Sequence, residues 1–189
     1  MKTAVVVLTW NAADRAVECL ASLQSQHRSV DYLLVVDNAS HDQTISRIEQ
    51  AWPKLPIIRN SSNLGFAGGM NVGIQALQSF PEPPDIVVLL NQDTTVEPAW
   101  LQEILQPFAD LQVGAVGCKI RYADGTIQHA GAYLEWPRAI TQHVGWHEPD
   151  TGQYDTIQTC DIVTGAAVAL RMQALNHVGL FDPGYTPAY

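Results

Sequence analysis

The stretch "DIVVLLNQDTTVEP", residues 85–98, joins an apolar run to an acidic end. Its apolar residues, 86–90, are mostly β-branched or Leu and lie between Pro84 and Pro98, a pattern that predicts a buried strand. Ligands of open α/β sheets bind beyond the carboxyl ends of the strands, where Asp93 would lie. Asp also opens turns through hydrogen bonds to its own backbone, so this stretch alone leaves a turn and a ligand site equally open.

The first 110 residues alternate strand and helix patterns. The predicted strands cover residues 4–9, 32–37, 56–59 and 85–91. Apolar positions at helical spacing follow each of them: Val17, Leu20, Ala21 and Leu23; Ile45, Ile48 and Trp52; Met70, Ile74 and Leu77; Leu101, Ile104, Leu105 and Phe108. Repeated units of this kind predict an α/β fold with a mostly parallel sheet and helices on both faces.

The pattern changes after residue 113. Three strands joined by turns are expected over residues 114–122, 126–134 and 140–146. A last strand over 166–171 and a short helix over 172–178 follow. The ending "GLFDPGYTPAY" contains no terminating helix pattern, so we expect one domain over residues 1–189 that is incomplete at its C-terminus.

Composition limits the class of protein. A chain of 189 residues with 47% hydrophobic and 15% charged residues is typical of one globular domain. A formal charge of −9 argues against a nucleic-acid-binding surface. Cys19, Cys118 and Cys160 are widely spaced, which favours reduced thiols and predicts no zinc site. No apolar run reaches the length of a signal peptide or membrane span, so we expect a soluble, cytoplasmic protein.

Polar side chains follow four of the predicted strands. They are Thr9-Trp10-Asn11, Asp37-Asn38, Asn63-Leu64-Gly65 and Asn91-Gln92-Asp93. Carboxyl ends of parallel strands share one edge of a sheet, so these groups should converge. Each has another explanation: Asn11 and residues 40–43 suit helix starts, and the glycines after residue 64 suit close packing. Four such groups in register favour a ligand site.

Two phosphate-binding motifs are missing from the Gly-rich segment, and this suggests how a ligand could be bound. "NLGFAGGMNVGIQAL", residues 63–77, contains neither Gly-x-Gly-x-x-Gly nor a Gly-Lys-Ser/Thr ending, so it is neither a dinucleotide fingerprint nor a P-loop. A divalent cation held by Asp93 is then the natural way to bind a diphosphate.

Five segments together resemble family 2 glycosyltransferases of the GT-A fold. They are "VVVLTWNAADRAVECLASLQSQ", "LLVVDNASHDQT", "NLGFAGGMNVGIQAL", "LLNQDTTVEPAWL" and "VTGAAVALRMQALNHVGLFD". The Asn-x-Asp-Thr version at residues 91–94 is similar to bacterial rhamnosyltransferase-like members. The resemblance covers essentially the whole chain. It implies a nucleotide-sugar-binding half over residues 1–110 and an acceptor-side half over 111–189.

The resemblance also implies roles for individual residues. Thr9, Trp10 and Asn11 would lie along the nucleotide, and Asp37 would accept a hydrogen bond from a pyrimidine base. The sugar-nucleotide pocket would further include Asn38, Asn63, Gly65, Asn71 and Gln92. Asp93 would bind Mg²⁺ or Mn²⁺, although Asn91 stands where the family often has an acid.

His129, Gly165 and Asp182 fall on the acceptor side of the resemblance, although a His placed like His129 is more often just a strand residue of a hairpin. The implied reaction is metal-dependent, inverting transfer of a sugar from dTDP- or UDP-sugar to a saccharide or lipid-linked hydroxyl, in polysaccharide biosynthesis. The catalytic base is expected beyond Tyr189, so this chain should bind nucleotide with little transfer.

Two alternatives stay open. A sugar-phosphate nucleotidyltransferase shares the sheet topology, but "TWNAADR", residues 9–15, replaces the Gly-rich, Arg-containing loop of those enzymes. The other alternative is a nucleotide-sugar-binding fragment without catalysis. Peripheral association of a longer protein with a membrane is left open as well.

Overall fold

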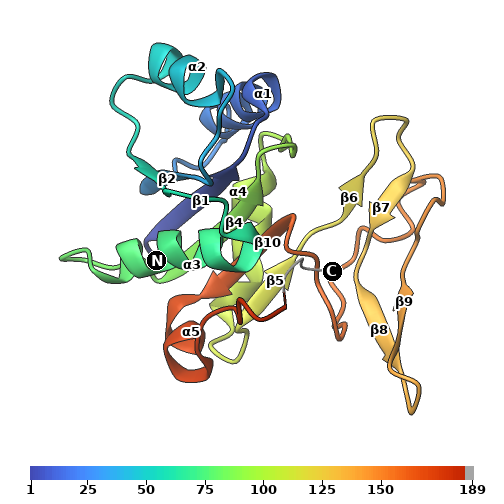
Figure 1. Cartoon of the computed structure of the whole chain (residues 1–189). Helices are drawn as coiled ribbons and strands as arrows, with labels where there is room; N and C mark the ends of the chain where they lie inside the picture. Colours follow the sequence, from blue (N-terminus) through green and yellow to red (C-terminus); the bar gives the residue numbers. More distant parts are fainter. Residues whose placement is uncertain (186–189) are drawn as a thin grey trace.

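A six-stranded sheet forms the centre of the computed structural model, which describes residues 1–185 (Figure 1). The strand order is β3-β2-β1-β4-β10-β5. The strands are β1 (Thr3–Thr9), β2 (Tyr32–Asp37), β3 (Ile57–Arg59), β4 (Ile86–Asn91), β5 (Ala115–Gly117) and β10 (Ala167–Arg171). The first four pair in parallel, and β10 is antiparallel to both β4 and β5. The predicted, mostly parallel α/β sheet is confirmed; residues 186–189 of the predicted domain lie outside the described residues.

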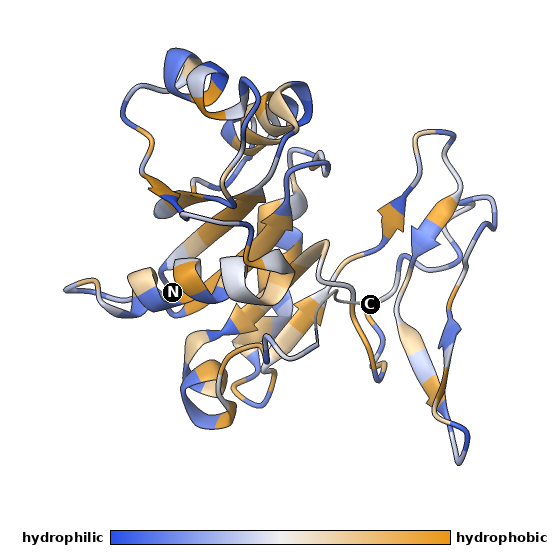
Figure 2. Cartoon of the chain, viewed as in Figure 1, coloured by the Kyte–Doolittle hydropathy of each residue, from blue (hydrophilic) through white to orange (hydrophobic). Residues whose placement is uncertain are grey.

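Helices cover both faces of this sheet, as predicted. One face carries α1 (Ala13–Gln24), α2 (Thr44–Ala51), α4 (Trp100–Leu105) and the 3₁₀ helix η1 (Gln106–Ala109); the other carries α3 (Gly65–Gln78) and α5 (Met172–Val178). Successive strand residues point to opposite faces, so β1 sends Val5 and Val7 into the first layer and Ala4 and Val6 into the second. The orange strands in Figure 2 follow from this two-sided burial.

Helix α3 lies unusually close to the sheet at Gly73. A Cβ atom at this position would be 2.6 Å from Cγ1 of Val6 and 3.1 Å from Cγ2 of Val36. Only a residue without a side chain permits this approach, so the glycines of the segment act at least partly as packing residues.

Residues 118–166 form an appendage outside the central sheet (Figure 1). It contains two two-stranded ribbons: β6 (Ile120–Arg121) with β7 (Ile127–His129), and β8 (Ala132–Glu135) with β9 (Ile140–His143). The strand predicted over 114–122 divides between the central sheet and the appendage, and the strand predicted over 126–134 breaks before β8. Hydrophobic pattern alone did not indicate these breaks, because strand partners decide where a ladder ends.

Two details of the predicted helices are wrong. The buried face of α1 carries Ala16 and Cys19 with Leu20 and Leu23, whereas Ala21 is exposed. Trp52 lies just after α2. Across residues 1–185 there is no helix with the length and apolarity needed to cross a membrane.

Candidate active site

The register of β1, β2 and β4 brings three of the predicted polar strand ends to one edge of the sheet. Thr9 is the Cα partner of Asp37, and Leu8 is the partner of Asn91. These three strands are neighbours, so the loops that follow them lie side by side above the carboxyl edge. The convergence inferred from the sequence is therefore present for these groups.

Asp37 is the centre of a buried hydrogen-bond network. This residue is only 3% exposed. Oδ1 accepts hydrogen bonds from the hydroxyls of Thr9 at 3.0 Å and Ser40 at 2.5 Å, and Oδ2 accepts one from the Ser40 amide at 2.9 Å. A carboxylate offers about four acceptor positions, so one remains after these three bonds.

The loops after β1, β2 and β4 are locked to one another. The amide of Trp10 donates to Oε1 of Gln92 at 2.8 Å, and Nε2 of Gln92 donates to the carbonyl of Trp10 at 2.9 Å. Asn11 donates its amide to the Ser40 hydroxyl at 2.9 Å and accepts the His41 amide through Oδ1 at 2.8 Å. The indole of Trp10 takes no part in these backbone hydrogen bonds, and the residue is about half exposed.

Asp93 stands at the open end of β4. Its side chain is 53% exposed, and Nη1 of Arg15 lies 4.0 Å from Oδ2. Beneath it, burial and the negative charge of Asp93 raise the pKa of the Cys19 thiol to about 12. Residues 1–185 contain no group of three or more His, Cys, Asp and Glu side chains that could hold a metal ion by themselves.

Asn38 and Asn63 hold the chain at the start of α3. Nδ2 of Asn38 donates to the carbonyl of Gly65 at 2.9 Å, and its Oδ1 accepts from Nδ2 of Asn60 at 2.9 Å. Asn63 accepts the amide of Gly65 at 2.8 Å and is exposed. Both ends of the buried Asn38 amide therefore have internal partners, and a ligand role for Asn38 stays a prediction.

Asn71 connects α3 to the end of the described chain. Nδ2 donates to the carbonyl of Phe181 at 2.7 Å, and Oδ1 accepts the Phe181 amide at 3.0 Å. The Phe181 ring packs edge-on against Phe66 with 5.6 Å between centroids. A Cβ on Gly165 would approach Phe66 to 2.6 Å, so Gly165 packs against the same ring.

Of the three predicted acceptor-side residues, Gly165 and Asp182 therefore lie against or next to the α3 layer. Asp182 follows Phe181, is exposed and accepts the Gly184 amide at 2.8 Å.

His129 lies elsewhere, in β7 of the appendage. It is 4% exposed, its ring centroid is 5.9 Å from that of His143, and its Nε2 is buried without a hydrogen-bond partner among residues 1–185. Burial, helped by the charge of His143, lowers the pKa of His129 and favours the neutral ring. His129 lines a cavity of about 670 Å³ between α4, β5 and residues 154–161. It is not part of the cluster around Asp37.

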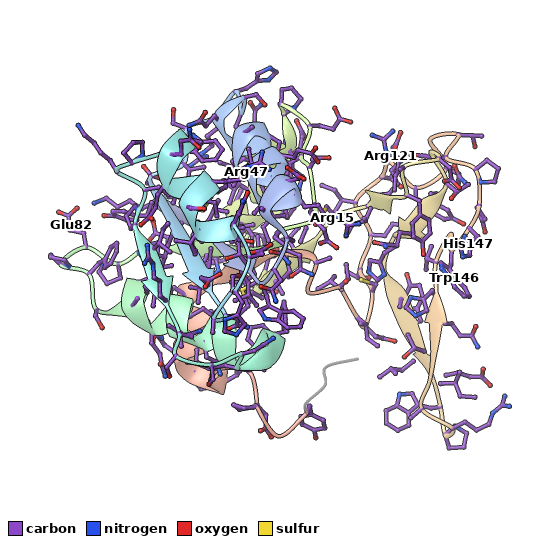
Figure 3. The ribbon with its side chains drawn as sticks, turned by 45° about the horizontal axis from the view of Figure 1, so that its top comes forward. Arg15, Arg47, Glu82, Arg121, Trp146 and His147 are labelled. Carbon is purple, nitrogen blue, oxygen red and sulfur yellow. The ribbon has the colours of Figure 1, made fainter. Side chains whose placement is uncertain are left out.

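Two residues of this cluster, Ser40 and Arg15, were not predicted as site residues from the sequence. Ser40 was attributed to a helix start, yet it bonds both Asp37 and Asn11; the helix start itself uses Asp42, whose Oδ1 accepts the Thr44 amide at 2.9 Å. Arg15 reaches Asp93 from the first turn of α1. In Figure 3, Arg15 lies on the body while Arg121, Trp146 and His147 lie in the separate appendage.

Comparison with known proteins identifies the family. Residues 4–178 match the family described as Glycosyl transferase family 2. The chain belongs to this family. It is 28% identical over 166 residues to the O-antigen biosynthesis protein RfbC of Myxococcus xanthus, covering 84% of this chain and 13% of that protein. It is 25% identical over 215 residues to the N-acetylglucosaminyl-diphospho-decaprenol L-rhamnosyltransferase of Mycobacterium tuberculosis, covering 96% of this chain and 65% of that protein.

Two solved structures share the fold of this chain. The Pyrobaculum calidifontis mannosyltransferase PcManGT, solved with GDP-Man and Mn²⁺, superposes with a TM-score of 0.66 at 23% identity, covering 96% of this chain and 48% of that one. Residues 1–349 of S. aureus TarS, solved with UDP, superpose with a TM-score of 0.63 at 18% identity, covering 100% of this chain and 52% of that one. The predicted GT-A fold and the rhamnosyltransferase-like family resemblance are confirmed.

Proposed function

We propose that this glycosyl transferase family 2 chain binds a dTDP- or UDP-sugar and that the protein transfers the sugar, with inversion, to a hydroxyl of a saccharide or lipid-linked acceptor. The observation that carries the proposal is the interlocked cluster above β1, β2 and β4. Its backbone loops are fixed by Gln92, Ser40 and Asp37, while Asp93 and the indole of Trp10 face solvent.

Asp37 would recognise the base. Its free acceptor position suits the N3–H group that uracil and thymine carry, and the three internal bonds hold the carboxylate at a constant angle. Trp10 would cover the base or ribose with its exposed ring, since an aromatic face is compatible with a planar base.

Asp93 would hold Mg²⁺ or Mn²⁺ together with the diphosphate. Mg²⁺ is commonly bound by one or two carboxylates plus substrate phosphates, and one exposed carboxylate at the strand end fits that arrangement. The cation would neutralise charge on the departing diphosphate. Arg15, 4.0 Å from Asp93, supplies a second positive charge on the same side.

The relatives support this chemistry in their own names. The mannosyltransferase was solved with GDP-Man and Mn²⁺, TarS with UDP, and the mycobacterial relative is named for rhamnosyl transfer to a diphospho-decaprenol-linked sugar. By analogy, a lipid-linked saccharide is the acceptor that we favour, and polysaccharide biosynthesis is the corresponding process.

Replacing Asp93 by Ala tests the proposal directly. Calorimetry with UDP and dTDP, with and without Mn²⁺, should show that Asp93→Ala loses the metal-dependent part of binding. The fold should be unaffected because the side chain is exposed. Asp14→Ala is the matched control: it removes an exposed acid of α1 that pairs with Arg47, and it should leave binding unchanged. Equal Mn²⁺-dependent binding by Asp93→Ala and the parent would contradict the metal role.

A further inference from the structure

The turn between β8 and β9 exposes an unusual set of side chains. Residues 136–140, Trp-Pro-Arg-Ala-Ile, are exposed without a break. Trp136 is 74% exposed and Ile140 is 44% exposed. An exposed Trp is common at interaction surfaces, because its ring is apolar while its N–H can stay hydrated. We call residues 136–140 the ribbon tip.

The ribbon tip carries one charge, on Arg138, and the neighbouring Glu135 neutralises it in an otherwise acidic protein. Between Asp124 and Glu148 the sequence contains only two residues of the Asp, Glu, Lys and Arg types, Glu135 and Arg138, and they form an ion pair with each other. The whole chain has a formal charge of −9. An acidic partner, whether nucleic acid or anionic lipid, is therefore repelled by the body and not attracted by the tip.

The shape of the tip argues against a protein partner. Among residues 1–185 the β8–β9 ribbon pairs with no other strand, except for one isolated bridge from Ala132 to Ile162 at its base. It stands away from the α/β body, with the turn at its far end (Figure 1). A stable protein interface buries about 800 Å² on each partner, more than a single narrow turn offers. A fluid bilayer can close around such a turn, and Trp is enriched at the level of the lipid headgroups.

We propose that the ribbon tip inserts into the interfacial layer of an uncharged, zwitterionic lipid bilayer. Trp136 lies at the headgroup level with its indole N–H in the polar layer, and Ile140 enters the boundary of the acyl chains. The Glu135–Arg138 pair stays among the headgroups. This inference goes beyond the donor chemistry and does not depend on it.

Flotation with phosphatidylcholine vesicles at millimolar lipid tests the inference. The double variant Trp136→Ser/Ile140→Ser should lower the vesicle-bound fraction about fivefold or more, because most of the apolar area that enters the lipid is lost. Leu111→Ser is the matched control, since Leu111 is 83% exposed but lies on the body; it should bind like the parent. Asp93→Ala should also bind like the parent, which separates this test from that of the proposed function.

Lipid charge sharpens the result. Replacing part of the phosphatidylcholine by phosphatidylglycerol should weaken binding at low salt, and added salt should restore it, because the body carries the negative charge. No binding of the parent to phosphatidylcholine would overturn the inference, and so would equal loss in Leu111→Ser. A lipid-free dimer of the parent that the double variant abolishes would assign the tip to a second copy of the chain instead.

Discussion

The α/β body and the appendage are stabilised in different ways. In the body, β1 and β4 are buried on both faces, and the loops at their carboxyl ends are locked by hydrogen bonds centred on Asp37 and Gln92. In the appendage, few side chains are fully buried, among them Ile127 and Ala132. A set of loops fixed by hydrogen bonds therefore lies next to a part of the chain with few buried side chains of its own.

Many of the contacts within the appendage are made by charged and aromatic side chains. Lys119 bonds Asp150 at 2.8 Å and Asp155 at 2.5 Å, and the bond from Lys119 lowers the pKa of Asp150. The rings of Tyr122 and His147 stack with 5.2 Å between centroids. The appendage has few fully buried apolar side chains, so we expect it to open locally while the body stays folded.

Removing matched core side chains should give the largest difference between the two regions. Leu89→Ala in β4 should lower the global free energy of unfolding by about 2–5 kcal/mol, as buried Leu truncations do. Ile127→Ala removes an equally buried side chain from the appendage. It should instead speed hydrogen exchange mainly in the appendage, residues 118–166. Denaturant unfolding and exchange mass spectrometry measure the two effects; equal global losses would show one cooperative unit.

Asp37→Ala should have the next largest effect, on the body alone. Loss of the base acceptor should weaken UDP or dTDP binding by about 1–3 kcal/mol, measured by calorimetry. ADP lacks the pyrimidine N3–H, so it should bind poorly to the parent and change little in the variant. Ser40→Ala is the control, because it removes a network bond without removing the acceptor. A similar loss for UDP and ADP in Asp37→Ala would point to a general structural defect.

A mild pH dependence is expected in the appendage. His129 has a pKa lowered from the ordinary 6.5, so below that pH the unfolded chain binds more protons than the folded one. The free energy of unfolding is therefore not reduced by His129 above about pH 6.5, where the ring is neutral in both states. It decreases as the pH falls from about 6.5 toward the pKa of His129 in the folded protein. Protection factors in β7 should decrease between pH 7 and pH 5 and respond less in His129→Gln. An unchanged response in that variant would assign the effect to other groups.

Much of the body could be predicted from the sequence because its signals are local. β2 spans the predicted residues 32–37, and β4 and β10 begin only one residue late, since continuous apolar runs identify strands that are buried on both faces. The convergence of Thr9, Asp37 and Asn91 also followed, because parallel strands share an edge. The appendage was predicted less well, since its short strands alternate weakly and their partners set their limits.

By itself the sequence determined the parallel α/β layers and the sheet edge on which the polar strand ends meet. Hydrophobic periodicity identifies each strand and helix locally, and their alternation along the chain implies parallel strands. The ordered motifs gave the family resemblance. Only the tertiary structure decided which side chains at that edge face solvent and which bind one another. The sequence did not show that the side-chain amides of Asn38 and Asn71 bond the backbone of Gly65 and Phe181, and the ligand roles of both residues stay predictions. The physical reason is that an amide removed from water, fully at Asn38 and partly at Asn71, forms hydrogen bonds within the protein, and the partners here lie 27 and 110 residues away in the chain.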